Sequence, residues 1–263
     1  MRERAPGPTS LDEHFADGLD TAVWTASYLP AWSSRAAAAA TWSVDGDGLH
    51  LTIPPEQPLW CPDLHEGALR VSAVQSGNWS GPLGTRQGQQ PFRDGLVVTE
   101  EQPAQWGCTP WYGRVEVECR AVLDASSMFS VWMVGLEDQA DRCGEICVVE
   151  VFGETVRDGR VALGSGLHRF RDPRLTEEFN AEPTVLDVSR PHRYAVDWRP
   201  GQVDFFLDGQ RHRTAAQAPD YPMQLVLGVL DFPDHTPSSH ARAAPPELVV
   251  SHVRIEPLPD LGG

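Results

Sequence analysis

The chain has 263 residues and a formal net charge of −16, and its 21 lysine and arginine positions are all arginine. A strongly acidic surface repels phosphate backbones, so we expect no nucleic-acid partner. Chemistry that needs a lysine ammonium group, such as Schiff-base formation, is excluded as well. Hydrophobic residues make up 41% of the chain, which is enough for one large core.

The N-terminal sequence, residues 1–6, has no apolar stretch behind its charges, and this predicts no signal peptide. We therefore expect a cytoplasmic protein, or a secreted one if a leader has been removed. No apolar run approaches the ~20 residues needed to span a bilayer, so we expect no membrane contact. Residues 1–10 and 258–263 are predicted to be flexible ends of a single domain, residues 11–257, that works as a monomer.

Short segments of alternating apolar and polar residues, separated by Gly and Pro, predict an all-β fold. A hairpin is expected to turn at Arg199-Pro200-Gly201. Strands at this spacing favour a sandwich of two antiparallel sheets. The segments with the clearest alternation are residues 48–53, 113–122, 193–198, 202–209 and 247–255.

The long segment from Leu59 to Trp111 shows little alternation and is predicted to be loops. Loops of this length in a compact domain are usually functional. Its aromatic side chains either anchor the loops to the core or stack on sugar rings, and the sequence leaves both open. Asn78, Arg86 and Gln87 are candidates to bond sugar hydroxyls. The aromatic residues of this segment are Trp60, Trp79, Phe92, Trp106 and Trp111.

The five cysteines are an odd number and predict reduced thiols rather than a disulfide framework. No Cys-x-x-Cys motif occurs and no close pair of His follows, so we expect no metal site. We expect no cofactor either. The cysteines are Cys61, Cys108, Cys119, Cys143 and Cys147.

Two glutamates, Glu145 and Glu150, interrupt an apolar segment that otherwise predicts a buried strand. On a regular strand they would point to opposite faces. One β-bulge between Cys147 and Glu150 would place both on one face with Cys147 between them. The carboxyl groups would then lie roughly 5 Å apart, as in retaining glycosidases. The alternative is a structural strand whose glutamates meet Arg120 or Arg142.

Several motifs occur in the order found in glycoside hydrolase family 16, and the chain resembles its laminarinase-like members over about residues 11–256. The segment from Glu145 to Glu150 resembles the bulged Glu-x-Asp-x-x-Glu signature. The other matching segments are Asp12 to Trp24, Trp111 to Val117, Phe129 to Gly135, Gly164 to His168, His192 to Trp198 and Val203 to Gly209.

The resemblance implies a concanavalin A-like β-jelly roll with a concave substrate cleft. It implies retaining endo-hydrolysis of a β-linked glucan or galactan, with Glu145 as nucleophile and Glu150 as acid/base. It also suggests Trp132 as a sugar platform, unless that residue belongs to the core, and His168 as its hydrogen-bonding neighbour. The expected partner is a polysaccharide or oligosaccharide.

The sequence departs from the family pattern in three places that matter for function. Ala140-Asp141 replaces the Trp-Pro usually found just before Gly-Glu, which implies a remodelled sugar subsite. The middle Asp of the signature is Cys147, whose thiol is expected to be neutral between two carboxylates. This replacement leaves a second function open, a catalytically impaired, lectin-like carbohydrate-binding protein. The Asp of the family's calcium site in the last strand is Ser251, so we expect no calcium there.

Overall fold

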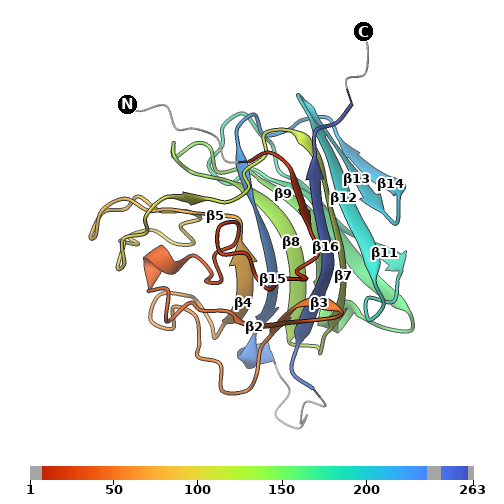
Figure 1. Cartoon of the computed structure of the whole chain (residues 1–263), viewed down its shortest axis with the longest axis horizontal. Helices are drawn as coiled ribbons and strands as arrows, with labels where there is room; N and C mark the ends of the chain where they lie inside the picture. Colours follow the sequence, from red (N-terminus) through yellow and green to blue (C-terminus); the bar gives the residue numbers. More distant parts are fainter. Residues whose placement is uncertain (1–7, 236–243, 260–263) are drawn as a thin grey trace.

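The computed structural model describes residues 8–235 and 244–259, and it consists of two large antiparallel sheets packed face to face (Figure 1). The predicted flexible ends fall largely outside the described residues. The jelly-roll architecture expected from the sequence is confirmed. None of the helices in the described residues is long and apolar enough to cross a membrane.

The larger sheet has eight strands in the order β14-β13-β12-β7-β16-β3-β2, and β1 pairs with β16 beside this path. All the strands predicted from alternation belong to it. The bounds are β1 Leu11–Glu13, β2 Thr41–Asp45, β3 Gly48–Thr52, β7 Gly113–Val122, β12 His192–Arg199, β13 Gln202–Leu207, β14 Gln210–Ala215 and β16 Glu247–Glu256.

The second sheet has six strands in the order β11-β10-β9-β8-β15-β4, so the two-glutamate strand β9 lies near its middle. Its bounds are β4 Arg70–Gln75, β8 Ser127–Gly135, β9 Glu145–Phe152, β10 Arg160–His168, β11 Glu178–Val185 and β15 Met223–Asp231. The smaller elements are β5 Gly77–Asn78, β6 Gln105–Trp106 and the 3-10 helices η1 Pro30–Trp32, η2 Gly153–Thr155 and η3 Pro233–His235.

The main core fills the space between the sheets, where Val117 and Val196 of one sheet meet Phe129, Val149 and Leu225 of the other. A second apolar cluster forms on the outer face of the six-stranded sheet, beneath the loops. The loops therefore roof part of this outer face, and the rest of it is free to form a site.

The segment from Leu59 to Trp111 is not only loops, because it contains β4 at the edge of the six-stranded sheet. Five of the six β4 residues are buried, on both faces of the strand. A strand buried on both faces has no polar side, so the alternation that reveals other strands is missing. All five cysteines are free and buried, as predicted.

Candidate active site

A β-bulge in β9 places Glu145 and Glu150 on the same side of the six-stranded sheet. Val149 pairs with Val131 of β8, but the next β8 residue, Trp132, pairs with Cys147, so Val148 has no partner. The register against β10 shifts at the same point, between Gly164 and Gly166. This is the bulge predicted from the sequence, and it lets Val148 and Val149 both face the core.

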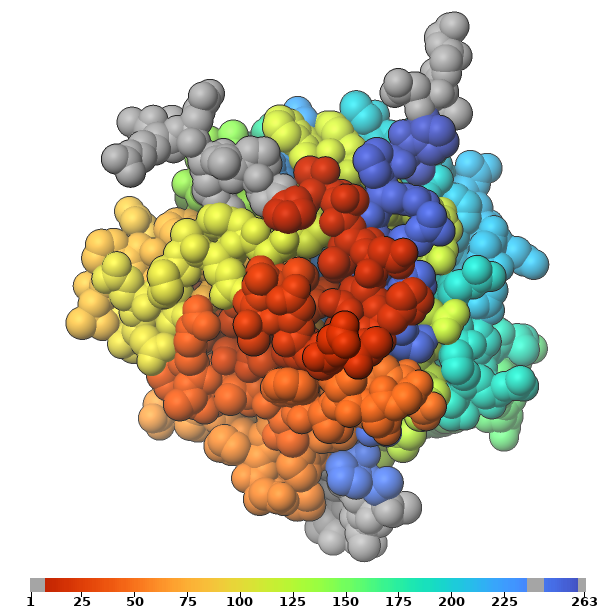
Figure 2. Space-filling model, viewed as in Figure 1, coloured from red at the N-terminus to blue at the C-terminus, as the bar shows by residue number. Residues whose placement is uncertain are grey.

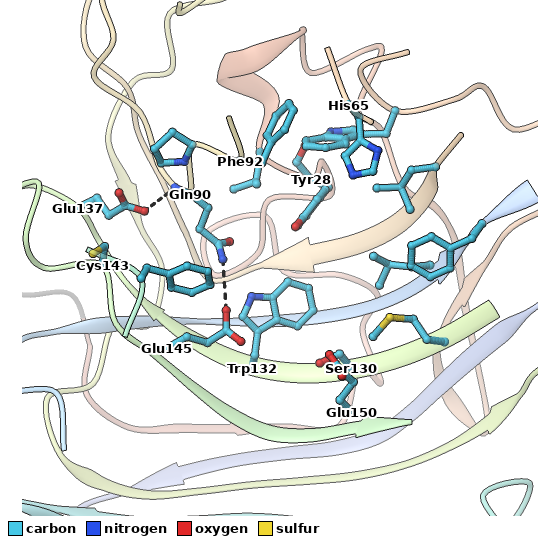
Figure 3. A pocket seen from close by; sticks show the side chains of 18 of the residues that line it. Tyr28, His65, Gln90, Phe92, Ser130, Trp132, Glu137, Cys143, Glu145 and Glu150 are labelled. Carbon is cyan, nitrogen blue, oxygen red and sulfur yellow. Dashed lines mark hydrogen bonds between the residues drawn. The ribbon is translucent and has the colours of Figure 1, made fainter. Parts of the chain in front are cut away.

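Both glutamates line a cavity of about 320 Å³ on the outer face of the six-stranded sheet (Figure 3). Alternate residues of β8, namely Met128, Ser130 and Trp132, form its floor beside β9. Loops distant in sequence close the other sides. They contribute Tyr28, Leu29, Trp60, His65, Leu69, Gln90, Pro91, Phe92, Glu137, Cys143, Phe170, Arg171, Leu230 and Phe232.

Burial raises the pKa of all three side chains of the signature above their usual values. Burial, with smaller contributions from Glu150 and Glu177, raises the pKa of Glu145 to about 8. Burial also raises the pKa of Glu150, and His168 partly offsets this. The thiol of Cys147 is fully buried, and burial and the two glutamates raise its pKa well above the usual range. Two carboxyl groups of this kind suit proton transfer and nucleophilic attack near neutral pH.

A polar network that sequence reasoning missed reaches Glu145 from above (Figure 3). The side-chain amide of Gln90 donates to Glu145 Oε2 at 3.5 Å, and the backbone N–H of Gln90 donates to Glu137 Oε1. Arg171 forms an ion pair with the other oxygen of Glu137. Burial raises the pKa of Glu137 to about 7 even though Arg171 lowers it.

Gln90 and Glu137 both have left-handed backbone conformations, with φ of 43° and 53°. Non-glycine residues adopt this conformation mainly where surrounding contacts enforce it. Contacts within the site therefore hold these two backbones in place. No local sequence motif marks either residue, because they lie in separate loops.

The structure brings two of the predicted sugar-stacking residues, Trp60 and Trp132, to the cavity wall. Trp111 is 50% exposed and borders another groove with Tyr112 and Trp198. Trp79 donates its indole N–H to the carbonyl of Leu136.

The remaining predicted binding residues also lie off the cavity wall. Trp106 pairs with Gly77 in the small β5–β6 sheet. Asn78 is buried and donates to Gln102 Oε1 at 3.0 Å, and Arg86 is exposed. His168 hydrogen-bonds Glu177 and stacks on Phe179, at 4.6 Å between ring centroids, although it still lowers the pKa of Glu150.

The position of the family's calcium ligand in the last strand does not fit calcium. Ser251 offers a hydroxyl rather than a carboxylate, and that hydroxyl donates to Glu118 Oε1 at 2.8 Å. Calcium prefers several carboxylate and carbonyl oxygens, so we assign no role to calcium there.

A family model, Glycosyl hydrolases family 16, matches residues 108–239, which is half of the chain and includes both glutamates. No curated protein matches the chain significantly. Several solved structures share the fold at less than 25% identity.

The first is a GlcNAcα1-4Gal-releasing endo-β-galactosidase from Clostridium perfringens, with a TM-score of 0.79 and 24% identity. The match covers 96% of this chain and 63% of that one, so this chain spans less than two thirds of the relative's length. The second, a laminarinase from Flavobacterium sp. UMI-01, has a TM-score of 0.58 and 16% identity over 93% of this chain and 98% of that one.

The third structure belongs to a study of endo-acting O-glycanases that members of the human gut microbiota express to initiate mucin breakdown. Its TM-score is 0.61, with 20% identity over 95% of this chain and 99% of that one.

Proposed function

Since this chain belongs to glycosyl hydrolases family 16, we propose that it is a retaining endo-β-galactosidase that cleaves internal bonds of a galactose-containing glycan. The observation that carries the proposal is the bulge in β9, which turns Glu145 and Glu150 toward a single cavity. Strand geometry gives a carboxyl separation of roughly 5 Å for this arrangement, the distance of retaining rather than inverting enzymes.

In the proposed reaction Glu145 attacks the anomeric carbon while Glu150 protonates the departing glycosidic oxygen. Burial favours the protonated form of Glu150 that this first step needs. Glu150 then takes a proton from water, and the hydroxide formed releases the sugar from Glu145. The amide of Gln90 supports the ionised form of Glu145, which has to act as the nucleophile.

The choice of galactose over glucose is supported by the TM-score of 0.79 with the galactosidase, against 0.58 with the laminarinase. A galactose-containing substrate is also compatible with the aromatic side chains that line the cavity. The axial 4-hydroxyl of galactose leaves three C–H groups on one ring face, and such an apolar face suits the indole of Trp132 or Trp60.

A second function, carbohydrate binding without turnover, is favoured by one specific observation. Cys147 replaces the Asp of the family signature, and the thiol is neutral in its buried position. The cavity would still hold a sugar, but the nucleophile would lack a charged neighbour that orients it.

The deciding experiment incubates the purified chain with β-1,4-galactan, poly-N-acetyllactosamine and mucin O-glycans, and with the β-1,3-glucan laminarin as the competing substrate. We expect new reducing ends from a galactose-containing substrate and, by NMR, a first-formed product with the β-configuration. Glu145→Gln and Glu150→Gln should each remove nearly all turnover.

The matched control is Glu154→Gln, which changes an exposed glutamate just beyond the same strand and should keep full activity. Cleavage of laminarin alone would refute the galactosidase assignment. Binding of a glycan without cleavage by the wild type would establish the lectin-like alternative.

A further inference from the structure

Three metal-binding side chains converge on the outer face of the eight-stranded sheet, away from the cavity. Asp12 Oδ1 lies 2.6 Å from Nε2 of His252 and 3.6 Å from Nε2 of His14. One ligand atom from each of the three lies within 4.8 Å of the others. The two imidazole rings stack at 4.0 Å between centroids, with planes 7° apart.

The pairing of the first strand with the last creates this cluster. β1 runs antiparallel to β16, with Asp12 opposite Arg254 and Glu13 opposite Val253. One further step brings His14 opposite His252. Side chains two apart on a strand share a face, so Asp12 and His14 project from the same side. Figures 1 and 2 show the red N-terminal segment lying along the dark blue last strand.

Other histidines on this sheet contact carboxylates but do not converge in this way. His50 uses Nδ1 for Glu247 and Nε2 for Asp45, so its two partners lie on opposite edges of the ring. His192 likewise divides its nitrogens between the Asp208 carboxylate and the Asp187 carbonyl. At the cluster, by contrast, two imidazoles present Nε2 to one carboxylate oxygen.

We propose that Asp12, His14 and His252 bind one divalent transition-metal ion of the zinc class. Two imidazole nitrogens and one carboxylate oxygen are a common three-ligand set for zinc, with water in the fourth position. The same set suits nickel and copper, whereas calcium and magnesium prefer oxygen ligands. The cluster is open to solvent, with side chains of Asp12 and His14 that are 70% and 63% exposed, so an ion can enter directly.

The ion would tie β1, a strand of only three residues, to β16. Its role is therefore structural. A ligand that binds only the folded chain raises its stability in proportion to the logarithm of the ligand concentration. The cavity lies on the other sheet, so hydrolysis should not depend on the ion.

The experiment uses the full chain, stripped with EDTA, and titrates it with zinc chloride by calorimetry and thermal unfolding. We expect one zinc per chain and a melting midpoint higher by roughly 5 °C at a hundredfold excess over the dissociation constant. Calcium chloride at the same concentration should leave the midpoint unchanged. His14→Ala and His252→Ala should each weaken zinc binding at least ~10-fold.

His192→Ala is the matched control, because it removes a surface histidine that also contacts a carboxylate, and it should bind zinc like the wild type. The proposal is wrong if zinc binds with unchanged affinity to the His14→Ala variant, since the zinc ligands would then lie elsewhere in the chain. It is equally wrong if the wild type binds no zinc or if calcium raises the midpoint as much. His14 lies beyond the end of β1, so its loss should not prevent folding.

Discussion

Glu145 accepts a hydrogen bond from Gln90, a residue 55 positions earlier in the chain. Gln90 is held in turn by its backbone N–H, which donates to Glu137. In the family signature a neighbouring Asp follows the nucleophile, but here that position is a neutral thiol. Gln90 therefore supplies, from a loop, a polar contact to the proposed nucleophile that β9 itself does not provide.

Replacing Gln90 with Ala should lower kcat/KM by roughly three- to tenfold, the worth of one ordinary hydrogen bond. In the proposed mechanism Glu145 acts in its ionised form, and its pKa is about 8, so we expect activity to fall as the pH drops below that value. Loss of a donor to the ionised form raises the pKa further, and the acidic limb of the pH–rate profile should move to higher pH.

The control for this measurement is Gln87→Ala. The structure places this predicted sugar-binding glutamine on the surface of the same loop and not on the cavity wall, so its loss should leave both the rate and the profile unchanged. A Gln90→Ala enzyme with a lower rate but an unshifted acidic limb would show that Gln90 only shapes the loop.

A different consequence of the raised pKa of Glu145 concerns stability. A carboxyl group whose pKa is higher in the folded chain than its ordinary 4.5 contributes stability that is complete below pH 4.5 and is lost as the pH rises toward 8. Glu145→Gln removes this pH-dependent loss. We expect the variant to be more stable than the wild type by roughly 1–3 kcal/mol at pH 8.5 and nearly equal to it at pH 4.5.

Thermal unfolding of both proteins at the two pH values measures this difference. Glu154→Gln serves again as the control, because the side chain is exposed and its removal should change neither midpoint. An equal gain for Glu145→Gln at both pH values would mean that packing, not ionisation, accounts for it.

The sequence predicts those parts of the fold and site that depend on local patterns. Strands of the eight-stranded sheet alternate in polarity because one face meets the core, and β9 reveals its bulge by the spacing of two glutamates. β4 and β15 are buried on both faces, so neither shows the same alternation. Gln90 and Glu137 reach the cavity from separate loops, a relationship that only tertiary folding creates.

The tryptophans give a second example of a relationship that the sequence alone does not predict. Trp60 and Trp111 both lie in or next to long loops, yet one lines the cavity and the other borders a separate groove. The sequence shows that the loops contain tryptophans, but only the folded path of each loop determines which surface a given indole faces.

Among the cavity tryptophans, Trp132 lies on the floor beside Glu145 (Figure 3). Trp132→Leu keeps an apolar side chain in the hydrophobic cluster on the outer face of the six-stranded sheet, but it removes the flat face on which a sugar would stack. We expect KM to rise by roughly three- to tenfold with a smaller change in kcat. Trp111→Leu should change neither constant, because its indole is 50% exposed outside the cavity; equal effects of the two substitutions would disprove the assignment.

Cys147 offers the sharpest test of how the site has diverged from its family. The thiol is buried between Glu145 and Glu150, and no arginine faces it among the charges that shift its pKa. Cys147→Asp would add a third carboxyl group beside Glu145 and Glu150 and raise the pKa of Glu145 by like-charge repulsion. Because Gln90 already contacts the proposed nucleophile, the added carboxyl group is not needed to orient it, and we expect turnover to fall by about tenfold or more. Cys147→Ser keeps a small neutral donor, and its turnover should stay within about threefold of the wild type.

The measurement is the rate of cleavage of the glycan substrate by each variant. A Cys147→Asp enzyme that is faster than the wild type would contradict the prediction. It would mean that the thiol is a degenerate substitute for the family's Asp and that Gln90 has not replaced that Asp.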